Sequence, residues 1–266
     1  MLLMRFRLNL EVDRSHGDLL PLSYQYEQSA VIYKILSRGD RDYSSWLHDN
    51  GFKLESGKRF KLFCYSRLNP DKYRILPKAG CMNLIGDRAE WTISFLPEKS
   101  TELFVRGLFA DQHFTLGNKD YRVGFHVINV ELLPSIPAEP TMEWEALSPV
   151  CVKKHAEGRI IFLSPEAPNY AEAILSGLLS RYESLYGHPY EGDIRGFQFE
   201  LLSPQPKSAL ITIKAGTPQQ TRIRGYRYHF RLTAPEELMH IASEGGIGEE
   251  CSQGFGYIEP LNKTIK

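Results

Sequence analysis

The sequence of 266 residues lacks three features that would narrow its function at once: a long apolar run, a net charge and a paired-cysteine motif. No stretch of about 18 apolar residues occurs, and this excludes a transmembrane helix. Lys plus Arg and Asp plus Glu both number 32, so no whole-molecule field points to nucleic acid or to a membrane surface. Any charge signal must therefore be local.

The four cysteines, Cys64, Cys81, Cys151 and Cys251, lie far apart and form no C-x-x-C motif. The opening residues MLLMRFRLNLEV reach a charged side chain after four positions, so we expect no signal peptide. We therefore expect a reduced, cytoplasmic protein. The nearest cysteine and histidine, Cys151 and His155, would supply only two of the roughly four ligands of a structural zinc site, so we predict no bound metal.

Hydrophobic periodicity predicts the same order of strands and helices in both halves of the chain. The order strand, helix, strands, helix, strand is typical of a ferredoxin-like domain. A short helix over 42–49 is expected to end at Asn50-Gly51, because glycine provides the left-handed stop that helices favour. The predicted strands are 5–12, 60–68, 81–86, 90–96, 121–133, 197–202, 208–214 and 220–234, and the longer helices are 23–38, 98–110, 169–187 and 235–245.

The segment PSIPAEP, residues 134–140, contains three prolines and interrupts this periodicity. We therefore predict an α+β protein of two tandem ferredoxin-like (RRM-like) domains, residues 1–136 and 137–266. The second domain would carry a basic strand region and a C-terminal glycine-rich loop.

Five glycines lie within residues 245–256, GGIGEECSQGFG. A phosphate loop requires G-x-x-x-x-G-K-[ST], but five residues separate Gly248 from Gly254, and Phe255 follows. A dinucleotide fingerprint also fails, because Cys251 stands at its third glycine and too little chain follows for the fold. Two interpretations stay open: a wide turn between a helix and a final strand, or a backbone that offers N–H groups to an anion such as an RNA phosphate.

Two segments carry a local excess of positive charge. Residues 201–235 contain no acidic residue, and 53–78 contain eight basic residues against two acidic ones. The period of a strand places Arg222 and Arg224 on one face, where they could follow phosphates. Solvated faces that bind nothing are the alternative for both segments. The basic residues of the first segment are Lys207, Lys214, Arg222, Arg224, Arg227 and Arg231.

The pattern G-I-G-x-x-x-S-x-G-F-G at 246–256, placed after the last predicted helix, resembles the glycine-rich signature of the CRISPR-associated repeat-RNA-processing endoribonucleases, the Cas-six family. The segments MRFRLNLEV, YQYEQSAVIYKIL, WLHD and KLFCYSRL fit the same family in order, so the resemblance spans nearly the whole chain. It implies metal-independent cleavage without a cofactor, in which the ribose 2′-hydroxyl attacks the adjacent phosphate and leaves a 2′,3′-cyclic phosphate and a 5′-hydroxyl. It also implies CRISPR repeat RNA as the partner and an effector complex as a further one, and it leaves the oligomeric state open.

By motif position, the resemblance places the catalytic residues on Tyr33, His48 and Lys61. An imidazole that titrates near neutrality can take or give a proton, and a lysine can stabilise negative charge on the phosphate in the transition state. From the residues alone, Tyr33 also fits a core position, His48 a surface histidine and Lys61 a solvated charge. Lys58 is the alternative to Lys61, and whether Tyr33 or His48 acts as the base stays open.

The predicted RNA contacts come from the two basic segments and the glycine-rich loop. A non-cleaving RNA-binding module of the same fold is the main alternative, and the presence of His48 favours an enzyme. A small-molecule nucleotide enzyme is disfavoured because neither phosphate-loop pattern fits. The predicted RNA-binding residues are Lys58, Lys207, Lys214, Arg222, Arg224, Arg227, Gly246, Gly248, Gly254 and Gly256.

Overall fold

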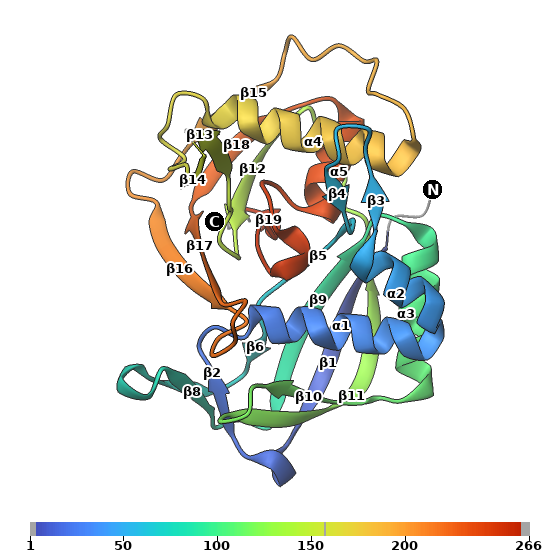
Figure 1. Cartoon of the computed structure of the whole chain (residues 1–266), viewed down its shortest axis with the longest axis vertical. Helices are drawn as coiled ribbons and strands as arrows, with labels where there is room; N and C mark the ends of the chain where they lie inside the picture. Colours follow the sequence, from blue (N-terminus) through green and yellow to red (C-terminus); the bar gives the residue numbers. More distant parts are fainter. Residues whose placement is uncertain (1–3, 157, 262–266) are drawn as a thin grey trace, which may run out of the picture.

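The computed structural model describes residues 4–156 and 158–261. Its first sheet is built from β1 (Met4–Asp13), β5 (Phe63–Tyr65), β6 (Asn69–Pro70), β9 (Arg88–Phe95), β10 (His113–Gly117) and β11 (Arg122–Leu133). The strand order is β10-β11-β1-β9-β5, with β6 also paired to β9, and all pairs are antiparallel. Helices α1 (Gln25–Gly39) and α3 (Glu98–Ala110) pack against each other and against this sheet (Figure 1). Strands β11, β1, β9 and β5 with these two helices form the ferredoxin-like arrangement.

Smaller elements decorate this first unit. Helix α2 (Arg41–Asp49) follows α1 directly, and the hairpin of β3 (Phe52–Lys53) and β4 (Arg59–Phe60) follows α2. A three-stranded sheet has the order β2-β8-β7, with β2 at Leu19–Pro21, β7 at Tyr73–Leu76 and β8 at Cys81–Leu84. Two 3-10 turns, η1 (Arg14–His16) and η2 (Pro77–Ala79), complete this part of the chain.

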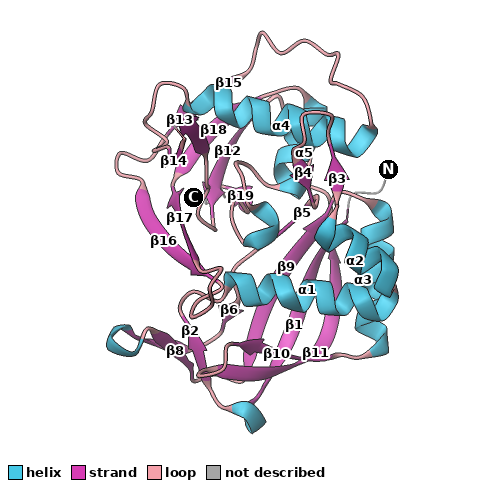
Figure 2. Cartoon of the chain, viewed as in Figure 1, coloured by secondary structure: helices cyan, strands magenta, loops and turns pink. Residues whose placement is uncertain are grey.

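The second unit repeats the arrangement with β12 (Thr141–Ala146), α4 (Tyr170–Tyr186), β15 (Gln198–Leu201), β18 (His229–Thr233), α5 (Glu236–Gly245) and β19 (Ile258–Pro260). Its sheet has the order β15-β18-β12-β19, which is the same ferredoxin-like order. Two hairpins are inserted, β13 (Lys153–Ala156) with β14 (Arg159–Phe162), and β16 (Lys207–Ile213) with β17 (Thr221–Arg227). The α+β class and the tandem ferredoxin-like fold are thus confirmed (Figure 2).

The strand predicted over 220–234 is divided in the structure. β17 pairs with β16 in the inserted hairpin, whereas β18 lies inside the four-stranded sheet between β12 and β15. The break falls at Tyr228, which is buried and shares a hydrogen bond of 2.7 Å with the Tyr170 hydroxyl. Sequence periodicity continues through this break because both strands are extended, so the alternation alone does not reveal it.

Each unit has its own apolar core. β1 shows why: Phe6, Leu8, Leu10 and Val12 alternate onto the face covered by α1 and α3 and are all buried. The second core gathers residues from β12 onward, together with Leu62 and Leu96 from the first part of the chain. Residues 134–140 between the two sheets contain no helix or strand, and a domain division at 136/137 stays our prediction.

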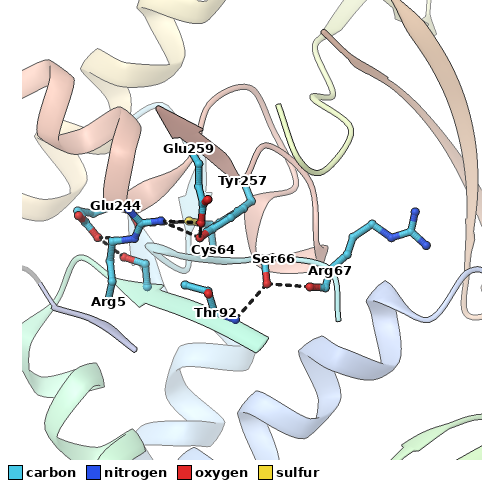
Figure 3. A network of polar contacts seen from close by, with 9 residues as sticks. Arg5, Cys64, Ser66, Arg67, Thr92, Glu244, Tyr257 and Glu259 are labelled. Carbon is cyan, nitrogen blue, oxygen red and sulfur yellow. Dashed lines mark hydrogen bonds and ion pairs between the residues drawn. The ribbon is translucent and has the colours of Figure 1, made fainter. Parts of the chain in front are cut away.

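The two units share a buried polar network at their interface (Figure 3). Arg5 on β1 donates to the Tyr257 hydroxyl at 2.7 Å and forms ion pairs with Glu244 at 3.9 Å and Glu259 at 3.4 Å. Glu244, the penultimate residue of α5, also accepts a hydrogen bond from the Ser94 hydroxyl on β9 at 2.5 Å. This network ties the first sheet to α5, β19 and the loop between them.

The cysteines are free and buried, so no disulfide links the units. Among the helices that the structure describes, none is long and apolar enough to cross a membrane.

Candidate functional site

The structure brings Tyr33, His48 and Lys61 together. Tyr33 lies on α1, His48 in the last turn of α2, and Lys61 in the link between β4 and β5. The rings of Tyr33 and His48 meet edge to face with their centroids 5.0 Å apart. Lys61 Nζ donates hydrogen bonds to the backbone carbonyls of Leu47 and His48 at 2.5 and 2.6 Å. The three residues form one cluster at the C-terminal end of α2.

The local sequence explains why α2 ends at this point. The Asp40 side chain accepts a hydrogen bond from the backbone N–H of Tyr43 at 2.9 Å and so begins the helix. Gly51, just after the helix, has a φ of +61°. A Cβ at Gly51 would lie 2.5 Å from the carbonyl oxygen of Phe60. Glycine therefore lets the strand β4 pass close enough for Lys61 to reach the end of α2.

His48 is the most exposed of the three, with 65% of its side-chain surface accessible. Its Nδ1 lies 2.8 Å from Oδ1 of Asp49. A proton on Nδ1 would be donated to this carboxylate, and Nε2 would then be free to accept a proton from a substrate. The geometry suits a histidine that acts as a general base through Nε2.

Tyr33 is half-buried beside His48. Burial raises the pKa of the Tyr33 hydroxyl well above its ordinary value, and the nearby negative charge of Asp49 raises the pKa further. The hydroxyl therefore stays protonated at neutral pH. In that form it can orient a ribose or a phosphate oxygen through a hydrogen bond.

Lys61 is also half-buried, and burial lowers the pKa of its ammonium group. The positive charge of Arg59 lowers this pKa further, whereas Asp49 opposes the shift. Lys58, the alternative, lies in the exposed turn between β3 and β4 and forms no hydrogen bond or ion pair with α2 among the described residues. The geometry thus favours Lys61 over Lys58 beside His48.

Because Gly51 sets the approach of Lys61, its replacement tests the geometry. Gly51→Ala is expected to slow RNA cleavage roughly 10-fold, since a Cβ would displace Phe60 and Lys61, and small misplacements of catalytic groups are costly. Gly57→Ala is the matched control: Gly57, in the turn of the neighbouring β3–β4 hairpin, has a φ of +84°, but a Cβ there would meet nothing within 4 Å. Single-turnover cleavage rates of both variants decide the matter, and equal rates would show that the close approach is irrelevant.

A cavity of about 470 Å³ opens beside this cluster. Lys58 and Lys61 line one side of it, helix α4 another, and the glycine-rich loop the third. Five cationic side chains and two carboxylates reach this cavity, namely Lys58, Arg59, Lys61, Lys153, Arg181, Glu249 and Glu250. The excess of positive charge suits an anionic ligand that extends from the cavity to His48.

The four glycines predicted to touch RNA have positive φ angles and are buried. A Cβ at Gly256 would lie 2.0 Å from the Ile247 carbonyl oxygen, and one at Gly248 would lie 2.5 Å from that of Cys151. A Cβ at Gly246 would lie 2.8 Å from the Gly256 carbonyl oxygen, and one at Gly254 would lie 2.6 Å from Cβ of Gln25. The close approach that these glycines permit is thus made to the protein. A contact between RNA and Gly246, Gly248, Gly254 or Gly256 stays a prediction.

Buried Arg181 on α4 holds this loop in place. Its guanidinium donates to the Gly248 carbonyl, to Cys251 Sγ at 2.9 Å and to the Gly177 carbonyl at 3.1 Å. The guanidinium carbon of Arg181 lies 5.6 Å from the centroid of the Phe60 ring, and this cation–π contact links α4 to β4. Arg181 therefore holds the glycine-rich loop, α4 and β4 together around the cavity.

The predicted basic face lies on the β16–β17 hairpin. Arg222 and Arg224 are exposed while Ile223 between them is buried, so the predicted alternation is confirmed. Lys214 Nζ lies 5.9 Å from the ring centroid of Tyr26 on α1, the helix that also carries Tyr33. Lys207 and Arg227 are cross-strand neighbours in the same hairpin, and both are exposed.

Arg231 does not belong to this face. It lies on β18, where it forms ion pairs with Glu143 at 2.8 Å and with Glu200. Its charge is therefore balanced within the protein, and the local excess in residues 201–235 is smaller than their composition indicates.

Asp49 is a residue of this site that sequence reasoning missed. It contacts His48, and its charge acts on the pKa of both Tyr33 and Lys61. Adjacency to His48 is the only sequence signal, and it is weak because neighbouring residues on a helix normally point apart. Asp49 is the last residue of α2, where this rule no longer holds.

Known proteins resemble both halves of this chain. Residues 19–126 match the model of the N-terminal part of the CRISPR-associated protein Cas6, and residues 134–260 match the model of its C-terminal part. A CRISPR-associated endoribonuclease Cas6 of Methanocaldococcus jannaschii is 27% identical over 95% of this chain and 91% of its own length. A CRISPR-associated endoribonuclease Cas6 of Pyrococcus furiosus is also 27% identical, over 99% of this chain and 92% of its own length.

The fold is shared as well. The structure of a Cas6-related protein from Pyrococcus furiosus superposes with a TM-score of 0.80 at 21% identity, and the match covers 98% of this chain and 100% of that one. Three findings agree: two family models match in sequence order, two relatives are 27% identical across nearly the whole chain, and the fold is shared with a Cas6-related protein. The chain belongs to the Cas6 family of CRISPR-associated proteins.

Proposed function

We propose that this protein is a metal-independent endoribonuclease that cleaves CRISPR precursor transcripts within their repeats to give mature guide RNAs. Attack by a 2′-hydroxyl on the adjacent phosphate would leave a 2′,3′-cyclic phosphate and a 5′-hydroxyl. The observation that carries the proposal is the cluster of Tyr33, His48 and Lys61 at the end of α2. Repeat RNA is the proposed partner, and a contact with an effector complex stays a prediction from family resemblance.

Each member of the cluster has a role that its surroundings support. His48 takes the proton of the 2′-hydroxyl through Nε2, because Asp49 engages its Nδ1. Tyr33 remains protonated and orients the reacting groups. Lys61 carries positive charge next to His48 and stabilises the extra negative charge on the phosphate in the transition state. These side chains together supply a base, an orienting hydroxyl and a cation. The leaving 5′-oxygen takes up a proton from the solvent, which reaches the exposed His48 side chain, and so becomes the 5′-hydroxyl.

The direct test is cleavage of labelled repeat RNA from the CRISPR array that accompanies the gene. The reaction is run in EDTA, beside a copy of the RNA that carries a 2′-deoxy group at the cut nucleotide. We expect cutting of the first RNA and not of the second. Tight binding without cutting would instead identify a non-cleaving RNA-binding module of the same fold, and cutting that requires added metal would contradict the mechanism.

Arg224 offers a test of the RNA path. Arg224→Gln is expected to weaken RNA binding and to flatten its salt dependence, lowering the slope of log K against log salt by about 0.7 for each lost contact to a single strand. Arg106→Gln removes the same charge from an exposed position on α3 and should leave the slope as it was. Titrations by fluorescence anisotropy at several salt concentrations measure both. Equal slopes in both variants would remove the β16–β17 hairpin from the RNA path.

A further inference from the structure

Two carboxylates line the cavity beside the proposed active site, Glu249 and Glu250 of the glycine-rich loop. Acidic groups repel phosphates, so a site that bound only the RNA backbone would gain from their absence. Carboxylates are however good acceptors for the N–H groups of bases. Their presence among five cationic side chains therefore points to a part of the cavity that reads a base.

Glu249, Glu250 and Lys153 differ in how many of their hydrogen-bonding atoms the protein already uses. Both oxygens of Glu250 are engaged, one by Lys153 Nζ and the other by Gln253 Nε2. Glu249 accepts a hydrogen bond from the backbone N–H of Lys153 at 3.1 Å through Oε1, and its Oε2 is 3.8 Å from Lys153 Nζ. Glu249 therefore keeps acceptor capacity on a carboxylate, and Lys153 keeps donors beside it.

The backbone of this wall is held in an unusual conformation. Among the described residues, only three that are not glycine have a positive φ, and Leu62 and Glu250 of these line the cavity. Such conformations persist where the surrounding structure enforces them, and they cluster at functional sites. For Glu250, the contacts of Arg181 and Lys153 to the loop provide that enforcement.

Hydrogen-bond complementarity selects one base. Guanine presents an acceptor, O6, followed by two adjacent donors, N1–H and the N2 amino group. A carboxylate can accept both donors while a neighbouring ammonium donates to O6, which makes three bonds. Adenine, cytosine and uracil each place an acceptor where guanine has one of those donors, so they lose a bond and bring two acceptors together.

We infer that this cavity binds a guanine of the repeat RNA, with Glu249 accepting from N1–H and N2–H and Lys153 donating to O6. The cavity volume of about 470 Å³ lies within the range of roughly 300 to 1,000 Å³ typical of small-ligand sites. Because Lys61 lines the same cavity and contacts His48, the guanine lies within one or two nucleotides of the cut bond. This inference rests on the proposed repeat-RNA cleavage.

The test replaces each guanine of the repeat with inosine, which lacks only the N2 amino group. Binding is measured with the full-length His48→Ala protein, so that cutting does not interfere. We expect inosine at one guanine near the mapped cut to weaken binding roughly 10-fold, and inosine elsewhere to have a smaller effect. In the Glu249→Gln protein the guanine-to-inosine ratio at that position should fall to about 1, whereas Glu102→Gln on α3 should retain it.

The outcomes separate the two proposals. A repeat RNA that binds equally well with guanine or inosine at every position near the cut overturns the guanine site and leaves the proposed nuclease standing. A preference for guanine over inosine that is unchanged in the Glu249→Gln protein also overturns the guanine site. Absence of any binding to the repeat RNA would overturn both. The inosine series uses the unaltered loop, so its result does not depend on the folding of the Glu249 variant.

Discussion

Replacing His48 with alanine is expected to slow cleavage of the repeat RNA by roughly 100-fold or more, the scale of losing a general acid-base group. The side chain is exposed at the end of α2 and supports no apolar core, so the fold and the affinity for RNA should persist. Single-turnover cleavage under saturating protein measures the rate, and fluorescence anisotropy measures binding.

His16→Ala is the matched control, because His16 is an exposed histidine in η1 and lies outside the cluster. It should cleave at the rate of the unaltered protein. A His48→Ala protein that loses binding in proportion to cleavage would make His48 a structural or RNA-binding residue. A rate that falls less than about 10-fold would show that another group acts as the base.

The separate elements of the fold were predictable because their signals are local. The alternation in β1 and the helical spacing of α1, α3 and α4 each lie within fewer than twenty residues, and the structure places those elements where periodicity predicts them. The end of α2 was predictable from Asn50-Gly51, since Gly51 has the left-handed conformation that such a stop requires.

Contacts between distant segments were not predictable. Arg5 and Tyr257 are 252 positions apart, and nothing in either local sequence indicates that they meet. The partners of Arg231 are likewise hidden, because Glu143 and Glu200 lie on two other strands of its sheet. The sequence alone did not predict that the proposed catalytic residues cluster, and family resemblance was needed, because only the fold brings α1, α2 and the β4–β5 link together.

The glycine-rich loop shows what composition leaves open. Five glycines near a terminus suggest a backbone laid open to a ligand, yet the structure closes this backbone against the chain itself. The side chains that face the cavity come from the residues between the glycines, among them Glu249 and Gln253. Glycine content predicts an unusual backbone conformation, but only the tertiary structure shows which surface that backbone packs against.

The buried polar network between the two units should contribute strongly to stability. Arg5→Ala is expected to lower the free energy of unfolding by about 3–5 kcal/mol, the usual cost of removing one partner from a buried ion pair. Arg5 has 5% of its side-chain surface exposed and Glu244 has none, so no solvent replaces the lost charge. Arg7→Ala is the matched control two residues along the same strand, where an exposed pair with Glu131 at 3.2 Å should contribute less than about 1 kcal/mol.

The loss in Arg5→Ala should depend on pH, and its sign follows from Glu244. Burial raises the pKa of this carboxyl despite the favourable charge of Arg5, so the pKa rises further when Arg5 is removed. A raised folded-state pKa stabilises the protein at low pH, and this stabilisation is lost as pH rises through that pKa. Urea unfolding should therefore show a smaller loss of unfolding free energy at pH 5 than at pH 8.

In a Glu244→Gln background the pH dependence should vanish and the loss should shrink, because no buried charge remains to be compensated. A loss that is the same at both pH values and in both backgrounds would mean that the ion pair with Glu244 does not carry the effect of Arg5.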